Sequence, residues 1–278
     1  MKTTTDVLYE VNDHIAEITI NREPYRNAQS RQVLEQLDEL FLKASEDQNV
    51  RVVAIFGAGH HFSSGHDLGT PDELEDRKNR PIPQGLRGRY QHSREIYVDK
   101  TTRWRNVPKP TIAGVTGYCI FGGWMVASAM DVIYAGESAM FLGSNFQYFS
   151  IPWDVHVRQV KELLFEGTFL DAYEAQRMGF VNRVVSDNEL RESVLNYARR
   201  VARNDPFQLR MTKMAVNHMQ DVQGFNSHIS SAHLMHMLSV EAEQDEDFAL
   251  RDYKGKGRPM VQRALENYRE RMSPLKNQ

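Results

Sequence analysis

Two stretches of the sequence decide the fold: Gly57–Leu68 (GAGHHFSSGHDL) and Lys109–Gly123 (KPTIAGVTGYCIFGG). Each begins near an apolar strand and runs into a glycine-bearing turn that is expected to open a helix. The first backbone N–H groups of a helix have no partner inside it and favour negative charge. Two such turns that face one oxygen atom would form an oxyanion hole.

The sequence around these turns predicts strands and helices in alternation. Strands are expected at Ile15–Ile20, Arg51–Phe56, Thr111–Thr116 and Val132–Ala135. A helix capped by Ser30 would bury Val33, Leu34, Leu37, Leu40 and Phe41, and a second helix is expected over Gly122–Met130. Because strand, turn, helix and strand follow in that order, the sequence indicates an α/β fold with parallel pairing and crossover helices.

The remaining chain carries fewer strand signals. Prolines, glycines and charges break the pattern between Gly69 and Arg105, where one helix is expected near Tyr90–Trp104. After Pro152 the chain is expected to be mainly helical. Its helix signals are an Asp171/Glu174 capping box with Gly179 at the far end, and an Asp205-Pro206 start. No further strand is expected from there to Gln278.

Composition limits the class of protein. The 278 residues are 41% hydrophobic and 26% charged with a net charge of −3, as in an ordinary globular protein. No block of like charge suggests a nucleic-acid surface, and no apolar run is long enough for a membrane span or a signal peptide. With one cysteine there is no intrachain disulfide, so a cytoplasmic location is expected.

From about Thr19 to about Lys213, the two glycine turns and their spacing resemble the crotonase (enoyl-CoA hydratase/isomerase) superfamily. The resemblance implies a spiral of ββα units over residues 1–205 and a C-terminal helical region over 206–278 that builds a homotrimer or a dimer of trimers. It also implies an acyl-CoA substrate, with coenzyme A as part of the substrate and no other cofactor. The segment between Gly69 and Arg105 is then either a solvated connection or the part that shapes the acyl pocket.

The resemblance assigns the oxyanion hole to two backbone N–H groups. One belongs to His66, which follows the first turn's glycine, and the other to Gly122, where Phe121 replaces the first residue of the family's glycine triplet. Hydratases of the family place two glutamates nearby, and the matching residues here are Met125 and Asn145. Neither side chain can carry a proton at neutral pH, so a two-glutamate hydration is not expected at these positions.

Asp154 is the candidate that replaces the glutamates, because it follows Ile151-Pro152-Trp153 in the loop where divergent family members keep a carboxylate. It is expected to act as an acid/base or nucleophile, or else only to cap the helix that runs through Val160. His156 is a second candidate. Tyr148 and Asn145 are candidate hydrogen-bond donors to the substrate, and Met125 and Trp153 are expected to line an apolar pocket.

The resemblance places coenzyme A against backbone around the first turn and the preceding chain. The expected contacts are Ser64, Gly65, Asp67, Leu68, Arg26 and Ala28, with Arg26 and Lys254 as candidate phosphate ligands. His60, His61 and His66 lack a metal-ligand spacing, so no metal is expected. Cys119 lies in an apolar run and is expected to be inert.

Three functions fit these observations. The first is an acyl-CoA enzyme that performs hydrolysis, C–C cleavage or an unusual hydration with Asp154. The second is a non-catalytic acyl-CoA-binding or assembly protein of the same fold that has lost the acids. The third, an RNA-binding relative, is disfavoured by the balanced charge.

Overall fold

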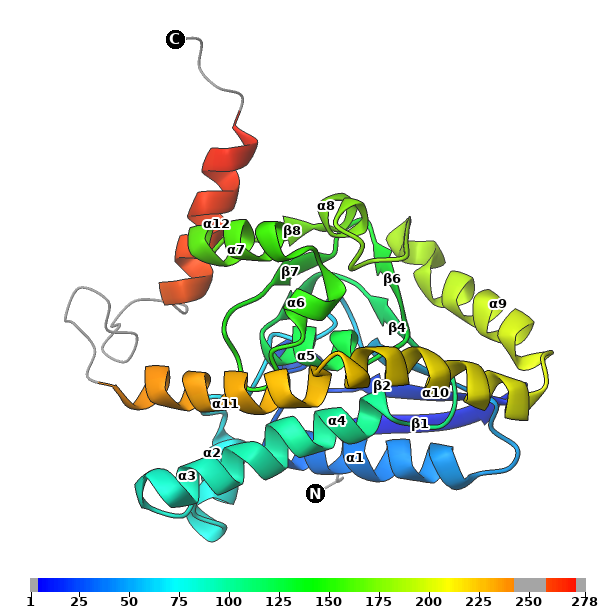
Figure 1. The fold of residues 1–278 in the computed structure, drawn as a ribbon, viewed down its shortest axis with the longest axis horizontal. Coiled ribbons are helices and arrows are strands. Elements are labelled where there is room, and N and C mark those ends of the chain that lie inside the picture. The colour runs from blue at the N-terminus through cyan, green and yellow to red at the C-terminus, as the bar shows by residue number, and fades with distance from the viewer. Residues whose placement is uncertain (1–4, 243–258, 274–278) are drawn as a thin grey trace.

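The computed structural model describes residues 5–242 and 259–273, which form two sheets and the helices around them (Figure 1). The six-stranded sheet has the order β1-β2-β3-β4-β6-β9, and the three-stranded sheet has the order β5-β7-β8. The strands of the first are β1 Val7–Asn12, β2 Ile15–Ile20, β3 Val52–Gly57, β4 Thr111–Val115, β6 Val132–Gly136 and β9 Arg183–Val185. Those of the second are β5 Tyr118–Ile120, β7 Met140–Leu142 and β8 Leu170–Asp171.

Parallel pairing is confirmed from β2 through β3, β4 and β6 to β9, and β1 joins β2 in antiparallel register. Alternate residues of β3 face two separate clusters, because Val53 and Ile55 meet the core under α1 while Val52 and Ala54 meet α9. A strand covered on both faces needs apolar side chains on both, which explains the uninterrupted apolar run.

The chain after Pro152 is less purely helical than expected, since β8 and β9 lie in it. These strands have two and three residues, too few to show a period-two alternation. They exist because β9 pairs with the edge of β6 and β8 pairs with β7. Their formation depends on pairing with distant strands and not on a local sequence pattern.

Helix starts follow their local capping signals. Ser30 caps α1 (Arg31–Glu46) by accepting from Val33 N–H, and Asp205 caps α10 (Pro206–Val222) by accepting from Gln208 N–H. The Asp171/Glu174 capping box of α8 (Ala172–Arg177) is confirmed. The other helices after β4 are α5 Gly122–Ser128, α6 Ile151–Asp154, α7 Val157–Glu166, α9 Leu190–Ala202, α11 Phe225–Glu241 and α12 Pro259–Met272. Short 3-10 turns lie at Glu23–Tyr25 (η1) and Asp187–Glu189 (η3).

The segment between Gly69 and Arg105 contains more helix than expected. Pro71 begins α2 (Pro71–Asn79) at the first helical position, where its missing N–H costs nothing. The expected helix near Tyr90–Trp104 is longer, and consists of α3 (Gly85–Ser93), a π-helical stretch η2 (Arg94–Asp99) and α4 (Lys100–Arg105) in direct succession. Figure 1 shows α4 beside α1, across the same side of the molecule as α10 and α11.

The last helix packs onto the small sheet. Ala264 of α12 is buried with Ile120, Leu142 and Phe169, and Phe121 packs against the same cluster. Asn267 Nδ2 adds a hydrogen bond to Glu166 O at 2.6 Å. Within residues 5–242 and 259–273, no helix is long and apolar enough to cross a membrane.

Asp38 of α1 holds α4 in place, because its carboxylate accepts from Lys100 Nζ, Arg103 Nη2 and Trp104 Nε1 at 3.1, 2.5 and 3.1 Å. Burial alone would raise the pKa of Asp38, but the hydrogen bonds from Arg103 and Lys100 outweigh burial and lower it. A carboxyl with a lowered folded-state pKa stabilises the fold above its unfolded pKa of about 3.9, and this stabilisation is lost as pH falls through the folded value.

Asp38→Asn is therefore expected to lower the free energy of unfolding at pH 7 by about 2 kcal/mol, since it weakens charge-assisted hydrogen bonds and leaves the buried Trp104 N–H with a poorer acceptor. The difference should shrink as pH falls below about 4. Denaturant unfolding at pH 7 and at low pH measures both effects. Glu39→Gln, at the exposed neighbouring position, is the control. Equal losses at both pH values would contradict the assignment.

Candidate active site

The sheet brings the two glycine turns together. Because β3 and β4 are parallel neighbours, with Val53 opposite Thr111 and Phe56 opposite Gly114, both strands deliver the chain to the same edge. Beyond that edge the pairing continues as an isolated bridge between Ser63 and Cys119. Ile120 N–H donates to Ser63 O at 3.0 Å, which ties the first turn to the strand that precedes the second.

Gly65 and Gly122 lie against each other where the turns meet. A Cβ on Gly65 would stand 2.7 Å from Ile120 O and 3.4 Å from Gly122 N, and the residue has φ +90°. Close approach and backbone angle therefore both require glycine at position 65. A Cβ on Gly122 would stand 2.6 Å from Gln29 Oε1 and 2.7 Å from His66 Nδ1, so a side chain there would disturb packing as well as a ligand.

The two N–H groups expected to form the oxyanion hole are free. Gln29 bridges the chain on either side of His66, because Gln29 N–H donates to Gly65 O and Asp67 N–H donates to Gln29 O. In a parallel bridge this pattern directs the N–H of His66 away from Gln29. Gly122 is the first residue of α5, where an N–H has no acceptor in its own helix. Neither N–H has an acceptor within the described chain.

Phe121, the departure from the glycine triplet, adopts φ +46° and ψ −98°. A non-glycine residue in this region is strained, and such strain persists only where the surroundings hold it. Phe121 N–H donates to Leu142 O at 2.9 Å, and the ring packs beside α12. These contacts hold the turn that presents Gly122 N–H.

Asp154, the carboxylate that the sequence indicates, ends α6. Its Oδ2 accepts from Ser128 Oγ, and Ser128 Oγ is also hydrogen-bonded to Ser150 Oγ. Burial raises the pKa of Asp154 to about 7, although the Ser128 hydroxyl and the positive charge of Arg105 lower it. A carboxyl with a pKa near 7 can both take up and release a proton at neutral pH.

The capping role considered for Asp154 is wrong. The next helix, α7, begins at Val157, and its N-cap is His156, whose Nδ1 accepts from Arg158 N–H at 3.4 Å. Val155 is extended and separates Asp154 from that helix. His156 is exposed at the surface and Asp154 is half-buried, so the helix cap and the candidate carboxyl are different residues.

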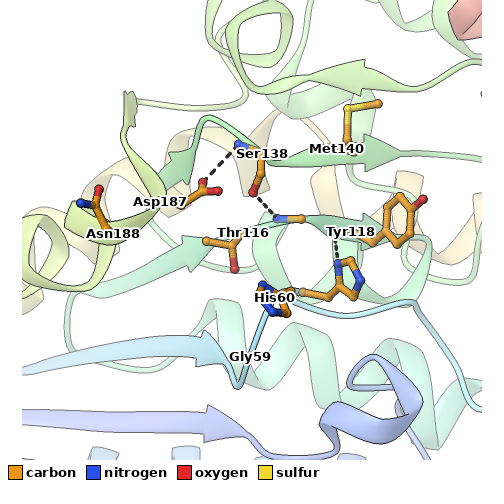
Figure 2. Close-up of a pocket in the computed structure, with 10 residues that line it drawn as sticks. Gly59, His60, Thr116, Tyr118, Ser138, Met140, Asp187 and Asn188 are labelled. Atoms are coloured by element: carbon orange, nitrogen blue, oxygen red, sulfur yellow. Dashed lines mark hydrogen bonds between the residues drawn. The ribbon is translucent and has the colours of Figure 1, made fainter.

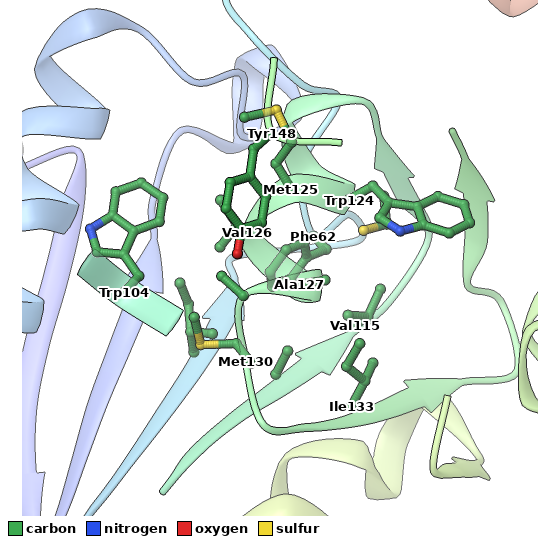
Figure 3. Packing of buried hydrophobic residues seen from close by; sticks show 14 of the residues in the cluster. Phe62, Trp104, Val115, Trp124, Met125, Val126, Ala127, Met130, Ile133 and Tyr148 are labelled. Atoms are coloured by element: carbon green, nitrogen blue, oxygen red, sulfur yellow. The ribbon is translucent and has the colours of Figure 1, made fainter. Parts of the chain in front are cut away.

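Met125 and Tyr148 belong to the large apolar cluster around α5 (Figure 3). Met125, which the resemblance matches to a family glutamate, has a buried side chain. Tyr148 is also buried, and its hydroxyl has no hydrogen-bond partner within the described residues. Burial raises the pKa of Tyr148, so the phenol stays protonated and remains a hydrogen-bond donor.

Asn145 and Trp153 lie under α11. Asn145 is exposed, and its backbone oxygen is hydrogen-bonded to His236 Nδ1 at 2.8 Å. Trp153 Nε1 donates to His228 Nδ1 at 2.9 Å, and the indole meets the Phe225 ring at 5.3 Å between centroids. Trp153 thus fastens α11 to the loop that carries Asp154.

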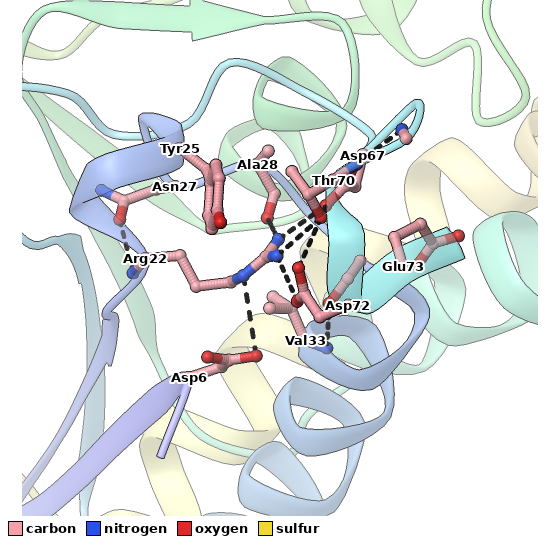
Figure 4. A network of polar contacts seen from close by, with 12 residues as sticks. Asp6, Arg22, Tyr25, Asn27, Ala28, Val33, Asp67, Thr70, Asp72 and Glu73 are labelled. Atoms are coloured by element: carbon pink, nitrogen blue, oxygen red, sulfur yellow. Dashed lines mark hydrogen bonds and ion pairs between the residues drawn. The ribbon is translucent and has the colours of Figure 1, made fainter. Parts of the chain in front are cut away.

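Arg22, for which no role was expected, fixes the first turn (Figure 4). Its buried guanidinium donates to Ala28 O at 2.6 Å, to Asp67 Oδ2 at 2.9 Å and to Asp72 Oδ2 at 2.5 Å. The only signal for this role in the sequence is an arginine at the end of an apolar strand, which needs buried acidic partners.

Asp67 is expected to contact coenzyme A, but its side chain is buried and hydrogen-bonded within the protein. It accepts from Gly69 N–H and Thr70 N–H at 2.9 Å each, besides Arg22. Burial would raise the pKa of Asp67, but the hydrogen bonds from Thr70, Gly69 and Arg22 lower it. Only the backbone of Asp67 would therefore be able to contact coenzyme A.

The other expected coenzyme A residues are distributed around this turn. Leu68 and Arg26 are exposed, Ser64 is half-buried, and Gly65 and Ala28 are buried. Ser64 N–H donates to Arg26 O at 2.9 Å, so the two chain segments predicted to contact the nucleotide lie side by side. Lys254 lies outside the described residues.

A separate cavity of about 580 Å³ lies at the other end of the first turn, and its lining includes His60, His61, Tyr118 and Asp187 (Figure 2). His61 Nδ1 accepts from Tyr118 N–H at 3.1 Å, and its ring stacks on Tyr118. In the part of the chain that is described, no group of three or more His, Cys, Asp or Glu side chains could hold a metal ion. Cys119 is buried, and burial raises the pKa of its thiol.

Comparisons with known proteins identify the family. The enoyl-CoA hydratase/isomerase family model matches residues 10–262, a wider range than the sequence resemblance. EchA13 of Mycobacterium tuberculosis, named as an enoyl-CoA hydratase, is 35% identical over 254 residues, which are 84% of this chain and 80% of that protein.

Solved structures show the same fold. A Mycobacterium smegmatis structure, named as an enoyl-CoA hydratase, is 39% identical with a TM-score of 0.77, over 86% of this chain and 98% of that one. An enoyl-CoA hydratase/isomerase structure from Xanthobacter autotrophicus Py2 is 31% identical with a TM-score of 0.78, over 88% of this chain and 90% of that one. The chain has the α/β crotonase fold with a C-terminal helical region, and it belongs to the enoyl-CoA hydratase/isomerase family.

Proposed function

We propose that this protein is an acyl-CoA enzyme in which the N–H groups of His66 and Gly122 stabilise a thioester oxyanion and Asp154 moves the proton. The reaction would be hydrolysis, C–C cleavage or an unusual hydration of the acyl group. Coenzyme A would enter as part of the substrate, with no further cofactor.

The observation that carries this proposal is the pair of free N–H groups. They come from two turns in van der Waals contact, and neither has an acceptor in the described chain. Fixed backbone donors need no reorganisation when charge develops on an oxygen, and one such donor typically contributes about 10²–10³ in rate. Their side chains are irrelevant to the donation, so Phe121 and His66 do not prevent it.

Asp154 is connected to the same helix as Gly122. Ser128, which donates to Asp154, lies six residues after Gly122 on α5, about 9 Å along the helix axis. A carboxyl about 9 Å from Gly122 along the helix axis would contact the acyl chain, or a water beside it, and not the thioester oxygen. We therefore assign Asp154 as a general base, with the hydroxyls of Ser128 and Ser150 beside it.

A non-catalytic acyl-CoA-binding protein is the second candidate. It is favoured by the residues that the resemblance matches to the two glutamates: Met125 is buried in an apolar cluster and Asn145 is exposed, and neither side chain carries a proton at neutral pH. Such a protein would bind thioesters as well as the enzyme does, but it would not turn them over.

We also propose that the C-terminal region joins copies of the chain into a homotrimer or a dimer of trimers. On α10 and α11 large apolar side chains face outward, which is unusual for a surface without a partner. These outward residues, here called the α10–α11 apolar face, are Phe207, Met214, Val216, Met219, Val222, Leu234, Met235 and Leu238.

Calorimetry with butyryl-CoA, crotonyl-CoA and the corresponding free acids tests the substrate class. The thioesters should bind more tightly than the acids, because only they carry the nucleotide that the first turn is proposed to hold. Hydration of crotonyl-CoA should be about 10²–10⁴ slower than in a two-glutamate hydratase. Absence of binding for every thioester would remove the proposed function, and binding without turnover of any acyl-CoA would favour the binding protein.

Asp154→Asn should reduce kcat/KM by about 10² or more, since the amide cannot accept a proton. In the parent enzyme, kcat/KM should rise with pH through about 7 as the carboxyl ionises, and the variant should lose this limb. A raised folded-state pKa stabilises the fold at low pH and loses that contribution as pH rises through about 7. The free energy of unfolding of the variant should therefore exceed that of the parent by more at pH 8 than at pH 5.

Melting curves at both pH values and a pH–rate profile measure these effects. Glu162→Gln, on the exposed side of α7, is the control for removal of a carboxylate. Full activity of the Asp154→Asn protein would show that another residue transfers the proton.

Leu238→Asp combined with Val222→Asp should reduce the molecular mass in solution from that of an oligomer to that of a monomer, because buried charges destabilise an apolar interface. Light scattering after size-exclusion chromatography measures the mass. Leu42→Asp on α1, also exposed and outside the α10–α11 apolar face, should leave it unchanged. A monomeric parent protein would contradict the proposed interface.

A further inference from the structure

Two polar side chains beside the proposed oxyanion hole, His66 and Gln29, have buried atoms that lack a hydrogen bond of ordinary geometry. Both ring nitrogens of His66 and both carboxamide atoms of Gln29 are inaccessible to solvent and lack hydrogen bonds among the described residues. Only 2% of Gln29 is exposed. Buried polar atoms are nearly always paired in native proteins, so four together require an explanation.

The two side chains converge on one point. His66 Nδ1 and Gln29 Oε1 lie 2.7 and 2.6 Å from the position where a Cβ of Gly122 would stand. Both therefore lie directly over Gly122, whose N–H is one of the free donors. The absence of a side chain at Gly122 is what lets them approach.

The backbone holds both residues firmly. Gln29 N–H donates to Gly65 O at 2.8 Å, and Asp67 N–H donates to Gln29 O at 2.9 Å. The neighbours Ala28 and Asp67 are both bound by Arg22, as Figure 4 shows. The pair is thus presented on a rigid support, as a binding site requires, and is not the result of a loose loop.

The His66 ring is also confined and neutral. Tyr97, on the π-helical stretch η2, packs against it at a tilt of 37° with ring centroids 4.1 Å apart. Burial lowers the pKa of His66 to about 4, a polar contact with the Gln147 side chain raises it, and the charge of His236 lowers it. Gln147 nonetheless lies outside hydrogen-bond geometry with either ring nitrogen. A neutral imidazole offers one donor and one acceptor, and the carboxamide offers two donors and an acceptor.

We propose that Gln29 and the His66 imidazole bind an uncharged oxygen of the acyl group, a hydroxyl or carbonyl near the thioester, and so select oxygen-bearing acyl-CoA over plain aliphatic ones. This selection rests on the proposed function. A hydroxyl pairs with one donor and one acceptor of the two side chains, and a carbonyl pairs with a donor, whereas a methylene leaves all of them buried and unpaired. A bound water has the same hydrogen-bonding chemistry but would give no preference between acyl groups.

The test compares 3-hydroxybutyryl-CoA with butyryl-CoA by calorimetry. The parent protein should prefer the hydroxylated thioester by about 10² or more, because sites built to pair a substrate hydroxyl reject analogues that lack it. Gln29→Met has nearly the same length without the polar atoms, and should reduce the preference to about tenfold or less. His66→Phe keeps the backbone N–H and the ring against Tyr97, and should reduce the preference likewise.

Thermal melting separates recognition from a structural role. Gln29→Met removes two unpaired buried polar atoms, so its melting temperature should equal or exceed that of the parent while its preference falls. A structural role predicts a lower melting temperature and an unchanged preference, which would overturn the proposal. Equal binding of both thioesters by the parent would also overturn the proposal, and would indicate that Gln29 and His66 bind a water molecule. If no thioester binds at all, the proposed function itself fails.

Discussion

The parallel pairing of β3 with β4 is the constraint on which the rest of the site depends. Its register, from Val53 opposite Thr111 to Phe56 opposite Gly114, fixes where each strand releases the chain. The bridge of Ser63 to Cys119 extends that pairing up to the turns. This pairing alone brings Gly65 and Gly122 together. A register slip of one residue would move both turns and bury the wrong side chains.

Buried charge supports this arrangement from the other side of the first turn. Arg22 has acidic and carbonyl partners at 2.5–2.9 Å, and Asp67 is bound by several donors at once. A paired and saturated charge network of this kind fixes geometry more than it adds stability, because desolvation offsets most of the attraction. The consequence is a rigid backbone at Gly65 and His66, while His66 and Gln29 beside it keep unsatisfied polar atoms.

Local signals in the sequence were sufficient for most of the fold. Ser30, Asp171 and Asp205 each cap the expected helix, because capping depends on residues within one turn. The strands β8 and β9 could not be predicted, since they form only against β7 and β6. The two turns were predictable as a motif, but the partners of Arg22 were not, since Asp67 lies 45 residues later in the chain. Asp154 stays a prediction made from its position, and the helix cap beside it is His156.

The docking of α12 has a consequence for the order in which the protein becomes functional. Pro259–Met272 packs on Ile120 and Phe121, the residues directly before Gly122. A chain is synthesised from its N-terminus, and its early part can fold first. The sheet that carries the second glycine turn can therefore form before α12 is made, whereas the support for the strained Phe121 arrives only with α12. A nascent chain would have the fold before it has a finished site.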